Sequence, residues 1–218
     1  MEDASSSGNV KSNSPPTMER EDWNKRYATK EFLWTLEANR FLAEEVTNLK
    51  PANALELATG EGRNAVWLAD QGWSVHAVDF SDVAIEKGRQ LASARQVADR
   101  IEFQVADLRE YAPKARHFDL VTLIYLQVPW DELKPILARA VDAVAPGGTF
   151  LLVAHDSANL KNGCGGPQHA DLLYTADQVV AALGGALQIE KAQRVERPVI
   201  TESGLKVAID CLVRGRRI

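Results

Sequence analysis

Short apolar runs alternate with helical segments through most of this 218-residue chain, and this alternation constrains the fold more than any other feature. The strand-like runs fall at residues 54–58, 73–78, 101–105, 118–124 and 149–153. Between them, apolar residues recur at helical spacing, as at 65–69, 82–97 and 133–144. Strands that alternate with helices predict βαβ units and a parallel sheet covered by helices on both faces.

The two ends of the chain depart from this alternation. Near the C-terminus, a helix at about 176–183 is followed by strand-like runs at 187–195 and 206–213 with no helix between them, which predicts an antiparallel hairpin. Before Pro51, apolar residues at helical spacing predict an N-terminal helical cap. We therefore expect an α/β fold: a Rossmann-like, doubly wound, mostly parallel seven-stranded sheet with a C-terminal antiparallel hairpin and an N-terminal helical cap.

Charge and cysteine content exclude several classes of protein. The formal net charge of −5 gives no general attraction for nucleic acid. The two cysteines, Cys164 and Cys211, are too few for a disulfide scaffold and do not have the paired spacing of a zinc site, so we expect no metal. No apolar run reaches the roughly twenty residues of a membrane span, and no secretion signal is visible. We expect a cytoplasmic protein, monomeric or homodimeric, with a small-molecule partner and with neither nucleic-acid nor membrane partners.

The most informative motif lies where the first strand passes into the first helix. It reads Glu56-Leu-Ala-Thr-Gly60-Glu-Gly62, and glycines at that point let a ligand approach the backbone closely. The motif has no third glycine for a dinucleotide fingerprint and no Lys-Ser/Thr pair for a phosphate-binding loop. The carboxylate of Glu56 instead suits a ligand with a cationic amino-acid end.

Two further aspartates follow strands. Asp79 ends the second strand, where a carboxylate can accept hydrogen bonds from both hydroxyls of a ribose. Asp107 follows the third strand, where its carboxylate can accept a hydrogen bond from the amino group of an adenine while Leu108 packs against the ring. One adenosine can therefore contact all three loops.

This series, together with Ala145-Pro-Gly-Gly148 before a strand, resembles the class I S-adenosylmethionine-dependent methyltransferases over about residues 55–153. The resemblance implies S-adenosyl-L-methionine as the cofactor. The sequence departs from the usual pattern at Ala58 and Asn64, where many members of this class carry glycine.

A narrower resemblance covers nearly the whole ordered chain. The segments Trp23-Asn-Lys-Arg-Tyr27, Glu61-Gly-Arg-Asn-Ala-Val-Trp-Leu-Ala69 and Gly163-Cys-Gly-Gly-Pro167 are similar to the tellurite-resistance methyltransferase-like group. In that group an N-terminal helix lies over the methionine end of the cofactor. The likeness implies that Tyr27 and Trp34 help to cover the site.

These arguments give two sets of site residues. We expect the cofactor to contact Trp23, Tyr27, Trp34, Glu56, Ala58, Gly60, Gly62, Arg63, Asn64, Asp79, Phe80, Ser81, Asp107, Leu108 and Ile124. His155, directly after the fifth strand, and Tyr125, after the fourth, are the catalytic candidates, because a histidine can titrate near neutral pH. A dedicated base is optional for methyl transfer from a sulfonium, since alignment and exclusion of water are the protein's main tasks.

The domain organisation follows from these assignments. Because 45% of the residues are hydrophobic and 25% are charged, the chain suits a single globular domain. We expect that domain at 19–218: a helical cap at 19–50, a cofactor-binding core at 51–155, an acceptor-side loop at 156–173, and a C-terminal helix and hairpin at 174–218. Residues 1–18 are rich in Ser, Asn and Pro, which predicts a disordered tail.

Three functions remain open at this point. The first is an enzyme that methylates a small molecule by in-line displacement, either a chalcogen oxyanion such as tellurite or selenite or a small O, N or S nucleophile. The second is a non-catalytic protein that binds S-adenosylmethionine or S-adenosylhomocysteine. The third is an NAD-dependent oxidoreductase, which the missing third glycine and the acidic end of the first strand disfavour.

Overall fold

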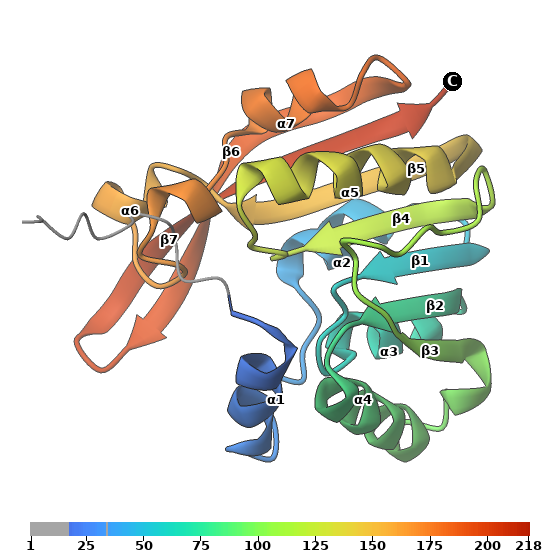
Figure 1. Ribbon diagram of the computed structural model, residues 1–218, viewed down its shortest axis with the longest axis horizontal. Coiled ribbons are helices and arrows are strands. Elements are labelled where there is room, and N and C mark those ends of the chain that lie inside the picture. The colour runs from blue at the N-terminus through green and yellow to red at the C-terminus, as the bar shows by residue number, and fades with distance from the viewer. Residues whose placement is uncertain (1–17, 34) are drawn as a thin grey trace, which may run out of the picture.

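The computed structural model describes residues 18–33 and 35–218 and is built around one seven-stranded sheet (Figure 1). The strand order is β3-β2-β1-β4-β5-β7-β6. The strands are β1 (Asn53–Leu57), β2 (Ser74–Asp79), β3 (Ile101–Val105), β4 (Phe118–Ile124), β5 (Val144–His155), β6 (Leu187–Thr201) and β7 (Gly204–Arg217). β1 to β5 pair in parallel, and β7 pairs antiparallel with both β5 and β6. The predicted sheet and its C-terminal hairpin are confirmed.

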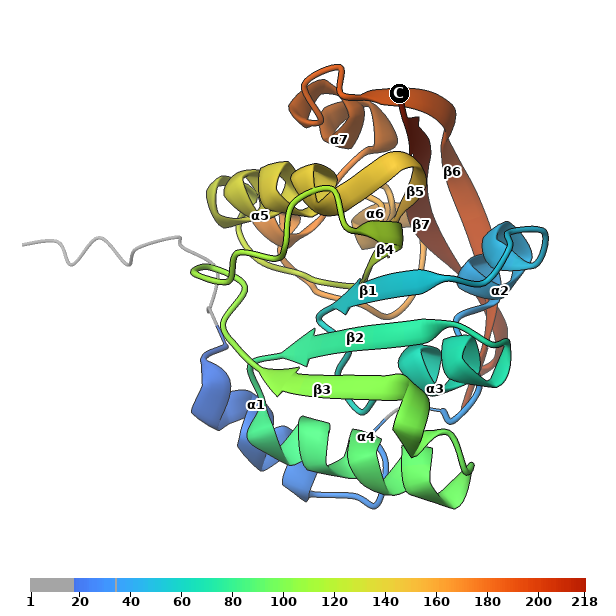
Figure 2. The same cartoon turned by 90° about the vertical axis from the view of Figure 1, so that its right-hand side faces the viewer.

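Helices cover both faces of the sheet (Figure 2). α2 (Arg40–Val46), α3 (Arg63–Asp70) and α4 (Asp82–Ala94) pack on one face, and α5 (Trp130–Ala143) and α7 (Ala176–Ala182) pack on the other. Short helices complete the fold: α1 (Arg20–Ala28), α6 (Asn159–Asn162), and single 3₁₀ turns at Ala98–Arg100 and Ala170–Leu172. None of the helices in the described part of the chain is long and apolar enough to cross a membrane.

Alternate residues of the central strands supply the two cores. Within β1, Ala54 belongs to the core under α2, α3 and α4, whereas Leu55 and Leu57 belong to the core under α5 and α7. All three side chains are at most 2% exposed. Because β1 is covered on both faces, its buried part, residues 54–57, is apolar except for Glu56, as a buried parallel strand requires.

The chain reverses its direction across the sheet between β1 and β4. Strands β2 and β3 are added on one side of β1, and β4 then pairs with its other side, with Leu57 opposite Leu123. Ligands of open α/β sheets bind outside the carboxyl ends of the strands at such a switch point. The fold therefore places the loops after β1, β2 and β4 around one crevice.

The N-terminal cap differs from the predicted run of helix over 19–50. Two helices, α1 and α2, are separated by an irregular segment, in which residue 34 lies outside the described part. Asn39 starts α2 as a cap, because its Oδ1 accepts the backbone N–H groups of Phe41 and Leu42. The expected tail at 1–18 lies outside the described residues except for Met18.

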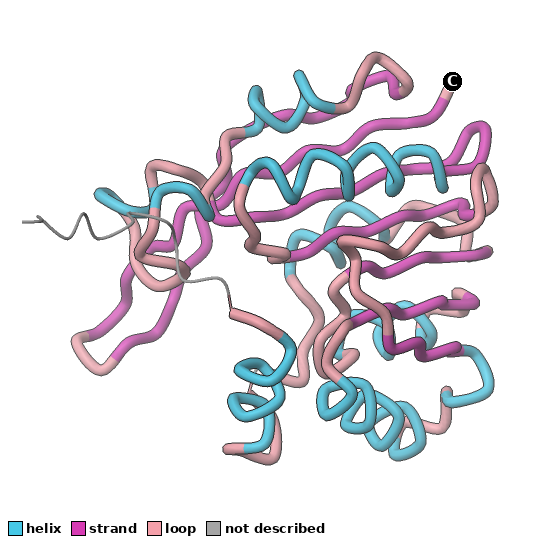
Figure 3. Tube along the Cα trace, in the orientation of Figure 1, coloured by secondary structure: helices cyan, strands magenta, loops and turns pink. Residues whose placement is uncertain are grey.

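The C-terminal hairpin is longer than predicted. The pairing of β5 with β7 ends at His155 opposite Asp210, while β6 and β7 continue to pair with each other as far as Thr201 and Gly204. The distal half of the hairpin therefore stands beyond the carboxyl edge of the sheet (Figures 1 and 3). Its tip carries exposed side chains such as Ile200, so no clean inside-outside alternation marked it in the sequence.

Two residues without glycine's freedom have left-handed backbone angles at the switch point. Ala58, after β1, has φ +59°, and Tyr125, after β4, has φ +57°. An L residue in this conformation costs about 1–2 kcal/mol. Glycine would adopt this φ without strain, whereas Ala58 adopts the turn at an energetic cost.

We predict that Ala58→Gly raises the free energy of unfolding by about 0.5–1 kcal/mol, because glycine adopts a positive φ without strain. Ala138→Gly is the matched control, since Ala138 is exposed inside α5, and it should lower the free energy by about 0.5–1 kcal/mol. Urea unfolding measures both. If Ala58→Gly lowered the free energy of unfolding as much as the control does, the claim that Ala58 is strained would be wrong.

Candidate adenosyl and acceptor sites at the strand ends

Glu56 is the buried carboxylate at the end of β1. Its side chain is 1% exposed, and the hydroxyl of Thr59 donates to Oε2 at 2.6 Å. Oε1 has no hydrogen-bond partner among the described residues. Burial raises the pKa of Glu56 to about 7, against the opposing effect of hydrogen bonds such as that from Thr59. A buried acceptor atom without a partner is costly, and a cationic ligand group would relieve it.

Asp79 connects the first two loops. Its Oδ2 accepts the backbone N–H of Gly60 at 2.8 Å, and its Oδ1 accepts that of Ser81 at 2.9 Å. Burial raises the pKa of Asp79, and the backbone hydrogen bonds partly offset this effect. The hydroxyl of Ser81 also accepts the N–H of Ala84 at 3.1 Å, which caps α4. The carboxylate therefore fixes the glycine turn after β1 relative to the start of α4.

The N-terminal cap is fastened over the glycine turn by one ion pair. Lys87 Nζ lies 3.1 Å from Glu61 Oε1 and donates to the carbonyl oxygens of Tyr27 and Lys30 at 2.5 and 2.6 Å. Both carboxylate oxygens of Glu61 accept the N–H of Leu33 at 2.9 Å. Lys87 and Glu61 both belong to the predicted cofactor-binding core at 51–155. Their contacts with the cap therefore fix the position of α1 relative to the strand ends.

Tyr27 and Gly60 approach each other closely. Tyr27 is 5% exposed, and a Cβ added to Gly60 would lie 3.0 Å from its hydroxyl oxygen. Trp23 packs against Tyr27 with ring centroids 5.5 Å apart. Tyr27, which was predicted to cover the site, thus lies beside the motif together with Trp23, a predicted cofactor contact, while Trp34 is outside the described residues.

The third loop differs from the arrangement that an adenine contact needs. Both carboxylate oxygens of Asp107 accept from the guanidinium of Arg109, at distances of 2.7 to 3.1 Å. Arg109 also pairs with Glu19 at 2.9 Å. Leu108 is buried, at 7% exposure. The proximity of this loop to the cap was not predicted, and the role of Asp107 toward adenine stays a prediction.

A separate cluster lies at the ends of β4 and β5. The rings of Tyr125 and His155 stack with centroids 4.8 Å apart. Both reach the fully buried Asp210 of β7: the Tyr125 hydroxyl donates to Oδ2 at 2.7 Å, and His155 Nδ1 lies 2.9 Å from Oδ1. The two predicted catalytic residues therefore share one carboxylate.

Arg197 of β6 completes this cluster. Its Nε donates to Asp210 Oδ2 and to the Tyr125 hydroxyl oxygen, each at 3.1 Å. Burial alone would raise the pKa of Asp210, but hydrogen bonds from His155 and Tyr125 and the charge of Arg197 outweigh it and hold the pKa below its usual range. Burial, aided by the charge of Asp210, raises the pKa of the Tyr125 hydroxyl, which stays protonated.

The acceptor-side loop at 156–173 packs on His155. Gly166 has φ +72°, and a Cβ there would lie 2.8 Å from His155 Nε2. Asn159 holds the loop, because its Oδ1 accepts the N–H of Ile209 at 2.7 Å and its Nδ2 donates to the carbonyl of Gly165 at 2.9 Å. The glycines therefore allow close packing against His155.

The remaining predicted residues lie in the turns after β1 and β2, at the start of α3 and at the end of β4. Arg63 Nη1 donates to the Thr35 hydroxyl at 3.0 Å, and Asn64 Oδ1 accepts the N–H of Asn39 at 2.8 Å, so both tie the cap to α3. Ile124 is 6% exposed at the end of β4. Gly62, Ala58 and Phe80 lie in the turns after β1 and β2.

Sequence reasoning missed Arg197, Asp210 and Lys87. Asp210 left one signal, since it is a lone carboxylate inside the apolar run Val207-Ala-Ile-Asp-Cys-Leu-Val213. Cys211 in the same run is fully buried and packs as a small core residue. Nothing in the sequence pairs Arg197 with the ends of β4 and β5.

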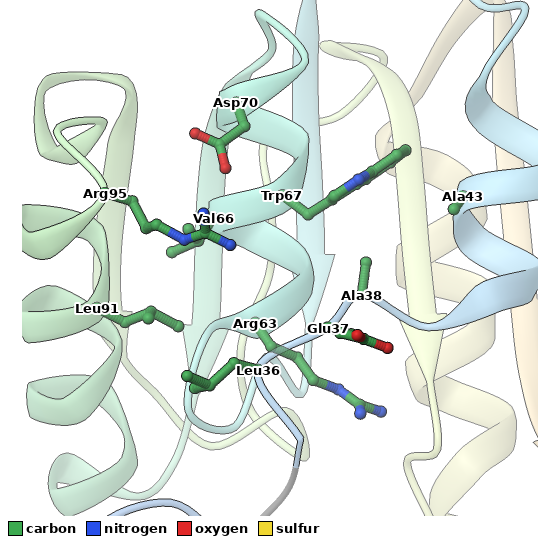
Figure 4. A pocket seen from close by; sticks show the side chains of 10 residues that line it. All are labelled: Leu36, Glu37, Ala38, Ala43, Arg63, Val66, Trp67, Asp70, Leu91 and Arg95. Atoms are coloured by element: carbon green, nitrogen blue, oxygen red, sulfur yellow. The ribbon is translucent and has the colours of Figure 1, made fainter.

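A hollow of about 300 Å³ lies elsewhere, between α3, α4 and the cap segment 36–38 (Figure 4). Its lining includes Leu36, Trp67 and Leu91, and it shares only Arg63 with the predicted site residues. Helix side faces form its walls, whereas the predicted residues come from strand ends. The hollow is therefore distinct from the crevice.

Known proteins share the central segment. Residues 54–148 match a family described as a methyltransferase domain. Hemagglutinin 1 of Eikenella corrodens is 30% identical over 122 residues, which make up 54% of this chain and 39% of that protein. The probable chloroplastic tocopherol O-methyltransferase of Oryza sativa subsp. japonica is 26% identical over 113 residues, 51% of this chain and 31% of the relative. The chain thus spans less than half the length of these relatives.

Solved structures share the fold over nearly the whole chain. The N-methyltransferase NodS from Bradyrhizobium japonicum WM9, in complex with S-adenosyl-L-homocysteine, is 18% identical with a TM-score of 0.68 and covers 91% of this chain and 97% of its own. TehB from Haemophilus influenzae is 15% identical with a TM-score of 0.68 and covers 91% of this chain and 67% of its own. At these identities the likeness establishes the fold.

We predict that Glu56→Gln stabilises the protein at alkaline pH. The pKa of Glu56 is about 7 in the folded protein, against an ordinary value of 4.5 for an exposed glutamate. Its stabilising protonated form is fully present below about pH 4.5, and this contribution is lost as the pH rises through 7. At pH 8 we expect a gain on the order of 2 kcal/mol that shrinks toward pH 5.

Urea unfolding between pH 5 and 8 measures this difference. Glu110→Gln, at an exposed carboxylate, is the control and should show no such slope. A gain in Glu56→Gln that does not depend on pH would refute the raised pKa.

Proposed function

We propose that residues 54–148, which match a methyltransferase domain, bind S-adenosylmethionine, and that the chain transfers the cofactor's methyl group to a small-molecule acceptor. The observation that carries the proposal is the position of the matched segment. It contains the turn after β1, with its buried Glu56, and the loops after β2 and β3. The nicotinamide-dependent alternative has no comparable support.

The adenosyl end of the cofactor is assigned to the loops after β2 and β3. We assign the ribose hydroxyls to Asp79, each of whose oxygens accepts one backbone N–H and has a further lone pair. Phe80 and Ser81, the next two residues after Asp79, are assigned to contacts beside the ribose. We assign the adenine to Asp107 and Leu108, and binding there requires Arg109 to release or share one oxygen of Asp107.

The methionine end is assigned to the turn after β1. Its ammonium group is the natural partner of the buried Glu56 Oε1, and its carboxylate suits the guanidinium of Arg63 at the start of α3. Tyr27 and Trp23 then cover this end from the cap. The backbone of Ala58, Gly60 and Gly62 allows the close approach, and Asn64 and Ile124 complete the walls.

The methyl-transfer step needs alignment more than acid-base chemistry. The nucleophile of the acceptor attacks the methyl carbon in line with the sulfonium, the carbon–sulfur bond breaks, and neutral S-adenosylhomocysteine remains. For a protic acceptor, His155 Nε2 takes the proton, with Tyr125 stacked against the ring. For a chalcogen oxyanion, the acceptor implied by the resemblance to the tellurite-resistance group, no base is needed because the nucleophile is already anionic.

The setting of this activity is also a proposal. The net charge of −5 gives no general attraction for nucleic acid, which favours a small molecule as acceptor. We propose that the protein works in the cytoplasm as a monomer or homodimer, without metal.

We predict that S-adenosylmethionine and S-adenosylhomocysteine bind to the purified protein and that NADH does not. Asp79→Asn should weaken binding of both adenosyl ligands by about 10- to 100-fold, because charge-assisted hydrogen bonds to the ribose become neutral. Asp99→Asn, at an exposed site after α4, is the matched control. Isothermal titration calorimetry gives the affinities.

Turnover then separates an enzyme from a binding protein. We expect S-adenosylhomocysteine to form with at least one acceptor of a panel of tellurite, selenite, thiols, phenols and amines. Binding without any product would favour the non-catalytic alternative, and unchanged affinity in Asp79→Asn would remove the assigned ribose contact.

A further inference from the structure

Arg197 presents an unused binding edge beside the proposed acceptor site. Its Nε is held by Asp210 and Tyr125, and the guanidinium lies over the Tyr125 ring at 5.6 Å from the centroid. These three contacts fix the plane of the group. Neither terminal nitrogen has a hydrogen-bond partner within the described chain, and the side chain is 26% exposed. The terminal N–H groups are therefore available to a ligand.

The surroundings of Arg197 favour an anion. Burial lowers the pKa of a second guanidinium, Arg63, and the positive charge of Arg197 lowers it further, so the two cations repel each other. Glu56, which opposes Arg63, has a pKa of about 7 and is only partly charged at neutral pH. The carboxylate of Asp210 already contacts His155, Tyr125 and Arg197, so its one negative charge is shared among three partners. A bound sulfonium adds a further positive charge to the crevice.

The two arginines belong to different halves of the crevice. Arg63 starts α3, next to the turn that holds Glu56, and so serves the cofactor's own carboxylate in the proposed function. Arg197 comes from the part of β6 that stands beyond the sheet and is fastened to Tyr125 and Asp210. The cofactor's carboxylate therefore leaves Arg197 unoccupied.

His155 adds a second constraint on the acceptor. Its Nδ1 faces Asp210 at 2.9 Å, which leaves Nε2 as the proton-accepting nitrogen. The described residues form no hydrogen bond to Nε2, and the backbone of Gly166 packs close beside it. A base held in one orientation by a buried carboxylate suits a nucleophile that must lose a proton.

We propose that the acceptor is a small organic acid, whose carboxylate binds the terminal nitrogens of Arg197 and whose hydroxyl, thiol or amine faces His155. This inference rests on the proposed function and narrows its acceptor class. A planar guanidinium fork matches a carboxylate in two parallel hydrogen bonds. Because Arg197 and His155 contact the same carboxylate, Asp210, the two groups of the acceptor need be only a few atoms apart.

The chemical step balances without a further reactant. The acceptor's X–H proton moves to His155 Nε2 as the X–CH₃ bond forms and the sulfonium S–CH₃ bond breaks. The electron pair of that bond stays on sulfur in S-adenosylhomocysteine. The imidazolium, stabilised by Asp210, later loses its proton to water. Asp210 is a positioning residue in this scheme, because it acts through His155 and Arg197.

The test compares carboxylic acids with their amides on the protein saturated with S-adenosylhomocysteine. The probes are benzoate, salicylate, thiosalicylate and anthranilate, each paired with its primary amide, and ligand-observed NMR gives the affinities. We expect the acids to bind more tightly than the amides. Arg197→Gln should lower acid affinity by about 10- to 100-fold and leave amide affinity unchanged.

Two variants control for structure and charge. Arg194→Gln is the matched control, since Arg194 lies on the same strand and pairs with Asp156 instead, and it should keep the acid preference. Arg197→Lys retains the positive charge but lacks the planar guanidinium, so it should keep only part of the preference for acids over amides. The acid-to-amide ratio is the decisive readout, because a general loss of packing would lower both affinities equally.

The outcomes are distinct. Equal binding of acids and amides by the unmodified protein, or an acid preference that survives Arg197→Gln, would overturn the proposal, as would turnover confined to tellurite or selenite. Failure of S-adenosylhomocysteine to bind at all would instead refute the proposed function, and the acceptor assignment with it.

Discussion

The pairing of β1 between β2 and β4 is the constraint on which the rest of the structure depends. Three parallel strands that end at one edge deliver Glu56, Asp79 and Tyr125 to a single crevice. None of these residues is close to another in the sequence. Burial raises the pKa of both Glu56 and Asp79, and carboxyl groups with raised pKa values cluster at functional sites.

The acceptor side is organised by one carboxylate in a comparable way. Asp210 is fully buried and contacts side chains from β4, β5 and β6. A buried charge of this kind is stable only when its hydrogen bonds are complete. Tyr125 and Arg197 donate to its Oδ2, and His155 Nδ1 lies 2.9 Å from its Oδ1. In the proposed function, the remaining nitrogens of His155 and Arg197 serve the acceptor. The methyl donor and the acceptor are thus assigned to separate carboxylates on one edge of the sheet.

Much of this arrangement could be predicted from the sequence, because local patterns encode it. The apolar runs and the glycine turn identified the parallel sheet, and the rule that ligands bind at strand ends selected Glu56 and Asp79. The break of the N-terminal cap into two helices was missed, since its cause is the capping side chain of Asn39, whose own backbone is held by Asn64 from a distant helix. Arg197 was missed because its role depends on the register of the hairpin, which apolar spacing does not specify.

Hydrogen–deuterium exchange with and without S-adenosylhomocysteine tests the central claim most directly, because it reports on the strand ends without any substitution. The account predicts slower exchange in the peptides that contain residues 56–64, 79–81 and 106–109, and unchanged exchange along α4 beside the separate hollow near Leu91. Protection confined to the hollow, or no protection at the three strand ends, would contradict it.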